Sequence, residues 1–271
     1  MQKGSFYIHA QDFLLFRKTT DEVSVITRQI SKIIFKKHIN SFLDIGSGSG
    51  ELTKTIVKKF KIKNTIAIDR HNFDKKWFKN IIFIKTDWLK FIYPKKFDFI
   101  LSAHSMGYLS FKQAEKGIRK IYDYLDENGC AVIIVYDNQG NWPDFKKIFY
   151  PKNKLKKSTV DYIEPIISKY NFREKIFFTK IYAKNIKQML QISRFLGEKY
   201  ISSYLKENKK ISIFLQKFQK GNKTIVFPLK HRLFILYKNK KFLNNFSFSS
   251  FTNRPQKGAG KWKTHDFSLL W

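Results

Sequence analysis

Short, continuously apolar runs alternate with amphipathic stretches along the first half of the chain. The apolar runs lie at 41–45, 64–69, 81–84, 97–104 and 130–136. Strands that are buried on both faces of a parallel sheet have such unbroken apolar runs. The stretches 51–59 and 110–125 between them predict helices. This alternation predicts a doubly wound α/β fold, in which ligands bind at the carboxyl ends of the strands.

A further helix is predicted before the first strand. Its apolar positions recur at helical spacing and give one face for packing against the sheet. They are Val23, Ile26, Ile30, Ile33 and Ile34. Thr19 and Glu22 have the spacing of a capping box, so we expect the helix to start there.

The pattern changes after residue 150. A helix is expected at 160–170, a strand at 175–182, one or two basic amphipathic helices within 185–218, and two last strands at 224–227 and 232–237. The whole pattern predicts a mostly parallel, seven-stranded sheet, with the late helices forming a lid over the acceptor site. We expect four parts: an aromatic segment and helix (1–40), an α/β domain (41–183 and 222–238), a helical insertion (184–221) and a basic aromatic tail (239–271).

Composition limits the chemistry. The chain of 271 residues has one cysteine, Cys130, inside a predicted strand, so neither a disulfide framework nor a zinc site is expected, and no metal site is predicted. The first 20 residues lack the continuous apolar stretch of a secretory signal. No apolar run reaches the roughly 18 residues of a membrane span. We therefore expect a cytoplasmic protein.

The charge is strongly positive and uneven. Lysine and arginine number 53 against 21 acids, which gives a formal net charge of +32. Residues 1–150 carry +11 and residues 151–271 carry +21. An AT-rich genome accounts for much of the lysine, whereas an anionic partner such as RNA would account for the shortage of acids. The sequence leaves both explanations open.

A glycine-rich turn follows the first predicted strand and opens a helix. Its pattern is D-x-G-x-G-x-G, with Asp44 ahead of Gly46, Gly48 and Gly50. Glycines let the backbone approach a ligand closely, and the helix start offers unpaired N–H groups. A pyrophosphate would tolerate the leading carboxylate poorly, whereas the cationic amino acid end of S-adenosylmethionine would favour it. Asp69 ends the second strand, where doubly wound folds hold ribose hydroxyls.

The segment from Thr19 to Asp137 resembles the class I S-adenosylmethionine-dependent methyltransferases. The resemblance rests on 44–50, Asp69, Asp87-Trp88 and 98–108. Within that superfamily, the chain is similar to the histamine N-methyltransferase-like group. The segments behind this finer likeness are the aromatic Tyr7, Phe13 and Phe16, then Thr19 to Glu22, and Ser102 to Leu109.

The resemblance implies roles for particular residues. Asp44 and the glycine loop with Ser47 would hold the methionine part, and Asp69 would accept the ribose hydroxyls. Arg70 would cover the adenosine, Asp87 would accept from the adenine amino group, and Trp88 would offer an apolar face. Ser102, Ala103 and His104 would lie beside the methyl group. The candidate catalytic and acceptor residues are His104, as a base or orienting group, with Tyr7, Tyr108, Tyr136, Asp137 and Asn138.

Three functions remain open at this point. The first is methyl transfer to a small molecule or peptide, at nitrogen. The second is RNA methylation of the rRNA adenine type, which the charge favours; however, Ser102-Ala103-His104-Ser105 replaces the proline-aromatic segment with which such enzymes stack a base. The third is a non-catalytic binding protein, against which the intact glycines and acids argue. The sequence favours the first function, with S-adenosyl-L-methionine as cofactor.

Overall fold

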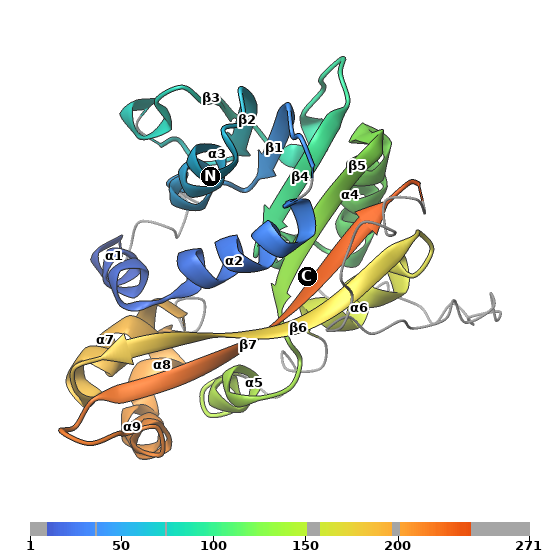
Figure 1. Cartoon of the computed structure of the whole chain (residues 1–271). Coiled ribbons are helices and arrows are strands. Elements are labelled where there is room, and N and C mark those ends of the chain that lie inside the picture. Colours follow the sequence, from blue (N-terminus) through green and yellow to red (C-terminus); the bar gives the residue numbers. More distant parts are fainter. Residues whose placement is uncertain (1–9, 36, 74, 151–157, 197–200, 240–271) are drawn as a thin grey trace, which may run out of the picture.

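The computed structural model describes residues 10–35, 37–73, 75–150, 158–196 and 201–239. One seven-stranded sheet organises the chain, with the strand order β3-β2-β1-β4-β5-β7-β6 (Figure 1). The strands are β1 (Ser41–Ile45), β2 (Asn64–Asp69), β3 (Ile82–Lys85), β4 (Phe97–Ala103), β5 (Leu125–Tyr136), β6 (Phe172–Ala183) and β7 (Ile225–Tyr237). β1 to β5 pair in parallel, and β7 runs antiparallel to β5 and β6. The predicted doubly wound, mostly parallel sheet is confirmed.

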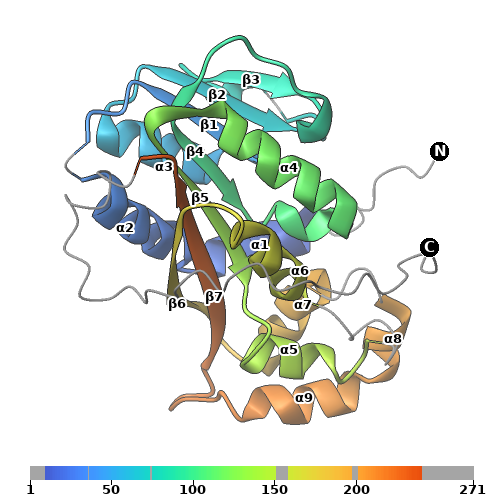
Figure 2. The same cartoon turned by 90° about the vertical axis from the view of Figure 1, so that its right-hand side faces the viewer.

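Helices cover both faces of this sheet. α2 and α3 pack on one face, and α4 and α6 pack on the other (Figure 2). The helices are α1 (Ala10–Thr19), α2 (Glu22–Ile34), α3 (Glu51–Phe60), α4 (Phe111–Tyr124), α5 (Asn141–Lys146), α6 (Thr159–Ile167), α7 (Ile186–Leu196), α8 (Ile201–Lys206) and α9 (Asn208–Gln216). Single 3-10 turns lie at η2 (Lys75–Phe78), η3 (Trp88–Lys90) and η4 (Met106–Tyr108). None of the helices in the described parts of the chain has the length and apolarity to cross a membrane.

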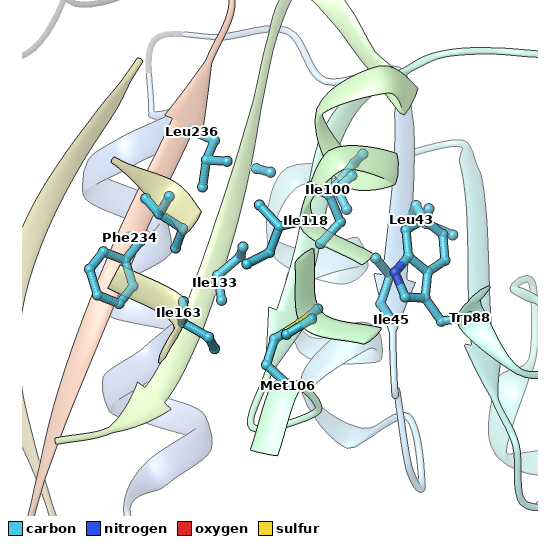
Figure 3. Packing of buried hydrophobic residues seen from close by; sticks show 14 of the residues in the cluster. Leu43, Ile45, Trp88, Ile100, Met106, Ile118, Ile133, Ile163, Phe234 and Leu236 are labelled. Carbon is cyan, nitrogen blue, oxygen red and sulfur yellow. The ribbon is translucent and has the colours of Figure 1, made fainter. Parts of the chain in front are cut away.

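The core lies between the sheet and its helices. Ile118 of α4 and Ile163 of α6 meet Ile100, Ile133 and Phe234 of the sheet, and all five side chains are completely buried (Figure 3). A second cluster packs α2 and α3 on the opposite face. Truncation of one such side chain to alanine costs about 2–5 kcal/mol, so the strand ends that carry the glycine loop rest on a rigid base.

α7, the first of the three helices between β6 and β7, packs against the amino-terminal helix. α1 lies against α7, where Arg194 forms two hydrogen bonds of 2.8 and 3.0 Å to the buried carboxylate of Asp12. Apolar residues of α1, α5, α7 and α9 form one cluster with the ends of β6 and β7. The predicted helical segment therefore exists, and its role as a lid stays a prediction.

Two local expectations were wrong. The capping box of Thr19 and Glu22 does not form: the N-cap of α2 is Asp21, and the Thr19 hydroxyl donates to the Leu15 carbonyl of α1 at 2.8 Å. The two last strands are a single strand, β7, which continues through Pro228. At that residue β7 pairs with β6 only, so one side of the strand has no ladder for proline to interrupt.

Candidate active site

The glycine loop joins β1 to α3 in a backbone shape that side chains would not fit. Gly46, Gly48 and Gly50 all have positive φ, at 71, 54 and 71°. A Cβ atom on Gly46 would lie 2.5 Å from the Ser105 Cβ, and one on Gly50 would lie 2.4 Å from the Phe78 ring. Both the dihedrals and the close neighbours therefore require glycine at 46 and 50.

The loop is tied to the carboxyl end of β2. The Gly46 and Ser47 amides donate to the Ile68 carbonyl at 2.8 and 3.1 Å, and the Gly48 amide donates to Asp69 Oδ2 at 3.0 Å. The other oxygen of Asp69 accepts from the His71 amide at 2.9 Å. Two backbone donors thus orient the Asp69 carboxylate beside the glycine loop.

Asp44 is a buried acid beneath the same loop. Its side chain accepts a 2.5 Å hydrogen bond from the Thr53 hydroxyl of α3, and the residue is only 3% exposed. Burial raises the pKa of Asp44 to about 7; the hydrogen bond from Thr53 opposes this shift, and the nearby Asp69 charge adds to it. A cationic group bound nearby would therefore stabilise the ionised form of Asp44.

The expected adenosine residues lie at the ends of β2 and β3. The Arg70 guanidinium lies 5.4 Å from the ring centre of Tyr108, which is 67% exposed. Asp87 caps η3, because its Oδ1 accepts from the Leu89 amide at 2.8 Å. Trp88 is 7% exposed and packs in the core (Figure 3). Its predicted contact with the cofactor stays a prediction.

The segment after β4 lies over the glycine loop. Ser102 is buried, and its hydroxyl lies 2.6 Å from that of Ser105, whose Cβ closes on Gly46. Ala103 is half-buried at the end of β4. Ser102 therefore lies near the loop through Ser105, and the predicted place of Ser102 and Ala103 beside the methyl group stays a prediction. Tyr7 lies outside the described residues.

His104 turns the chain at the carboxyl end of β4. Its φ is 60°, and its amide donates to the Ile134 carbonyl of β5 at 2.8 Å. Its ring stacks on Tyr136 with centroids 4.3 Å apart, and its Nε2 lies 3.0 Å from Glu22 Oε1 of α2. The other carboxylate oxygen of Glu22 accepts from Arg17 at 2.9 Å.

Sequence reasoning missed two members of this cluster, Glu22 and His231. Glu22 was interpreted as a helix cap, whereas its buried side chain faces His104; burial opposes its ionisation, but His104 and Arg17 help to lower its pKa to about 2. His231 of β7 is completely buried, and burial lowers its pKa to about 3. A lone histidine in an apolar strand gives no local signal, because its partners come from distant elements.

A hollow of about 70 Å³ lies beside His104. Its lining residues are His104, Gly107, Val135, Tyr136, Asp137, Trp142, Lys146, Ser158 and Thr159. Asp137 pairs with Lys230 at 3.2 Å and Arg232 at 3.5 Å, and Asn138 donates to Asp161 at 2.6 Å. Lys230 and Arg232 therefore balance the negative charge of the Asp137 carboxylate.

The residues of the loop fit S-adenosylmethionine. Ser47 Oγ is buried and has no hydrogen-bond partner among the described residues, so it has a donor and acceptor to offer. Asp44 suits a cationic amino acid end, and Asp69 suits hydroxyl donors. A pyrophosphate would meet both carboxylates at short range, which makes it a poor ligand here.

Comparisons with known proteins agree with this fit. Residues 14–173 match the family described as a methyltransferase domain. No curated protein matches the sequence. The fold is similar to that of the YcgJ protein from Bacillus subtilis, with a TM-score of 0.52 and 14% identity over 80% of this chain and 98% of that one. A Bacillus halodurans protein has the same TM-score and coverages at 11% identity. The chain spans 62% of the length of DesVI from Streptomyces venezuelae, with a TM-score of 0.39 and 19% identity over 48% of this chain.

The family match covers more than half of the chain, and the sheet order and loop geometry are independent of it. This protein therefore belongs to the methyltransferase domain family, as a class I enzyme whose methyl donor is S-adenosyl-L-methionine.

Proposed function

We propose that this enzyme methylates a nitrogen atom of a small molecule or peptide that enters the hollow beside His104. The single observation that carries the proposal is the contact of His104 Nε2 with the buried Glu22 carboxylate at 3.0 Å, at the strand ends that also carry the glycine loop. An amine must lose its proton before it attacks a methyl group, so a paired imidazole at this position is useful.

The tautomer of His104 follows from its partners. A proton on Nε2 is stabilised by the Glu22 carboxylate, which leaves Nδ1 as the proton acceptor. Nδ1 has no hydrogen-bond partner among the described residues. When Nδ1 takes the acceptor's proton, Glu22 stabilises the imidazolium that forms. Tyr136 stays a neutral phenol, because burial and the Glu22 charge raise its pKa well above the usual value.

The other residues of the site would bind the methyl donor. S-adenosylmethionine supplies a methyl group on a sulfonium, which is an excellent leaving group, so positioning and exclusion of water are the main tasks of the protein. We propose that Asp44 and Ser47 hold the amino acid end and that Asp69 accepts the ribose hydroxyls. Arg70 would stack over the adenosine with Tyr108.

Ser102 and Ala103 would shape the wall beside the methyl group. Asp87 would accept from the adenine amino group through the carboxylate oxygen that does not cap η3, with Trp88 behind it.

The test is methyl transfer from a radiolabelled donor to a cell lysate that is separated into RNA, protein and small molecules. Label in small molecules or peptides supports the proposal, and label confined to RNA contradicts it. His104→Gln should lower kcat by about 10²–10⁴-fold, the usual contribution of a positioned base. His38→Gln is the matched control, because His38 is an exposed histidine away from the site.

RNA is the alternative acceptor, and the charge of +21 over residues 151–271 favours it. Binding that neutralises phosphates weakens steeply with salt. Affinity for a nonspecific RNA, measured between 50 and 200 mM salt, should therefore fall by at least about tenfold if RNA is bound through several phosphates. A flat response removes this alternative.

A further inference from the structure

Three potential metal ligands converge behind the hollow, from parts of the chain that are distant in sequence. They are Glu22 of α2, His104 after β4 and His231 of β7, and one donor atom from each lies within 4.8 Å of the others. Glu22 and His231 are buried, and the His104 side chain is 20% exposed. Two imidazoles and one carboxylate are a set that divalent first-row metal ions favour.

The spacing of the donor atoms fits a shared ion. Glu22 Oε1 and His104 Nε2 lie 3.0 Å apart. Two ligands that are each about 2.0–2.1 Å from a tetrahedral metal ion lie about 3.3 Å from one another. The largest separation in the set has to close by at most about 1.5 Å to reach this value. His104 lies in a turn rather than in a strand, so small rotations of its side chain can supply the change.

The donor atoms are also left without other partners. Glu22 Oε1, His104 Nε2 and His231 Nδ1 are buried, and apart from the 3.0 Å contact between the first two they have no hydrogen-bond partner among the described residues. Buried polar atoms in this state cost free energy. Three of them around one point are therefore unusual, and an ion bound by all three would remove most of that cost.

Contacts outside the cluster already orient two of the three ligands, His231 and Glu22. His231 Nε2 lies 2.7 Å from the Thr179 hydroxyl, and its ring stacks on that of Phe177 with centroids 4.8 Å apart, which leaves Nδ1 as the ring nitrogen available to an ion. Arg17 binds Glu22 Oε2 at 2.9 Å and leaves Oε1 on the side of His104. Metal-binding histidines and carboxylates are commonly oriented through such outer hydrogen bonds.

We propose that Glu22, His104 and His231 bind one divalent first-row metal ion, with Zn²⁺ as the reference ion. Three protein ligands leave a coordination position open, as in catalytic rather than structural zinc sites. His104 also lines the hollow of about 70 Å³, so the open position is next to the proposed acceptor site. The sequence could not predict this site, because no two of its ligands are close in the chain.

The ion would change how the acceptor is activated, and this consequence alone rests on the proposed function. With the ion on Nε2, the ring proton of His104 would lie on Nδ1, which would then be a hydrogen-bond donor. The ion, rather than His104, would activate the acceptor, because it would lower the pKa of an N–H or O–H group bound in its open position. The proton leaves to water. The acceptor class narrows to molecules with a nitrogen or oxygen atom that can bind a metal ion.

The test measures metal binding directly. The purified full chain is stripped with a chelator and titrated with Co²⁺, whose visible spectrum reports coordination, and with Zn²⁺ in competition. We expect one ion per chain. Glu22→Gln, His104→Gln and His231→Gln should each weaken binding by more than about 100-fold, and Thr179→Val by about 10–100-fold. His38→Gln should leave it unchanged. Equal binding by wild type and the three ligand variants would overturn the proposal.

Two further measurements guard against a variant that fails to fold. X-ray absorption of the Zn²⁺-loaded wild-type chain should show two imidazoles and an oxygen ligand, and a spectrum without imidazole would overturn the proposal. Zn²⁺ should raise the Tm of the wild type and not that of His231→Gln. Binding of S-adenosylhomocysteine, followed in the same samples, should not depend on the ion. Loss of that binding with metal binding intact counts against the methyltransferase site and not against the metal site.

Discussion

Binding of the cofactor should depend on pH through Asp44. The pKa of this buried carboxyl group is about 7 in the free protein, because burial outweighs the hydrogen bond from Thr53. A cationic amino group beside it would favour the charged form and lower its pKa. Binding should therefore release a proton from Asp44, and affinity for S-adenosylhomocysteine should rise with pH.

The size of the effect follows from the fraction of Asp44 that is already ionised. At pH 8 about nine-tenths of the molecules carry the charge, whereas at pH 6 about one-tenth do. The affinity should therefore be about tenfold weaker at pH 6, which corresponds to about 1.4 kcal/mol. At pH 7 about half a proton should be released for each ligand bound.

Asp44→Asn is the decisive variant, because asparagine keeps the shape and can still accept from Thr53. It should bind more weakly at pH 8 and show a nearly flat pH dependence. Isothermal titration in two buffers with different ionisation enthalpies measures both the affinity and the proton release. The same pH dependence in wild type and Asp44→Asn would refute the reasoning, because the titrating group would then lie elsewhere.

The same substitution should stabilise the protein without ligand. The pKa of Asp44 is raised on folding from 3.8 to about 7, so the unfolded chain ionises more readily and folding becomes less favourable as pH rises from about 4 to 7. At pH 8 the penalty is complete, at up to about 4 kcal/mol. Denaturant unfolding at pH 8 should thus find Asp44→Asn more stable than wild type, with the difference vanishing near pH 4.

Three further predictions concern other contacts of the fold and site. Asp69→Ala should weaken S-adenosylhomocysteine binding by more than about tenfold in titration calorimetry, because charge-assisted bonds contribute about 1.5–3 kcal/mol; unchanged affinity would exclude Asp69 as a ligand. Gly46→Ala should lower the free energy of unfolding by about 1–3 kcal/mol, since the new Cβ meets Ser105 at 2.5 Å, and Ser105→Gly should recover part of the loss in denaturant melts. Arg194→Met should cost about 1–3 kcal/mol in the same assay, because the buried Asp12 carboxylate loses its two hydrogen bonds from Arg194, and Asp12→Asn in addition should restore part of the stability.

The parts of the molecule that local sequence determines were predictable. The five parallel strands are apolar runs that need no knowledge of their neighbours, and the loop from Gly46 to Gly50 combines a local demand for positive φ with a helix start. The position of Asp69 beside the glycine loop followed from the spacing of strand and loop in doubly wound sheets, and its contact with the ribose stays a prediction. These are properties of a short stretch of chain, which a single sequence contains.

The parts that depend on distant contacts were not predictable. α1 was expected only as an aromatic segment, because its helix is stabilised by packing on α7 rather than by its own periodicity. Glu22 has the spacing of a helix cap, and only the fold brings His104 to it. His231 lies among apolar residues of β7, and its hydrogen-bond partner in the described part of the chain, Thr179, comes from the neighbouring strand.

The two buried acids of the site, Glu22 and Asp44, differ in how far neighbouring groups compensate their negative charge. Burial opposes ionisation of Glu22, but its contacts with His104 and Arg17 help to lower its pKa, whereas the partner of Asp44 within the described parts of the chain is the neutral Thr53 hydroxyl, with the like charge of Asp69 nearby. The cationic amino group of the methyl donor gains more from Asp44, since Arg17 already pairs with Glu22. The amino end of the donor is therefore directed to the glycine loop, and the hollow beside His104 stays available for an acceptor. Exchanging the two environments would lose this selectivity, because a free carboxylate at Glu22 would compete for the same cation.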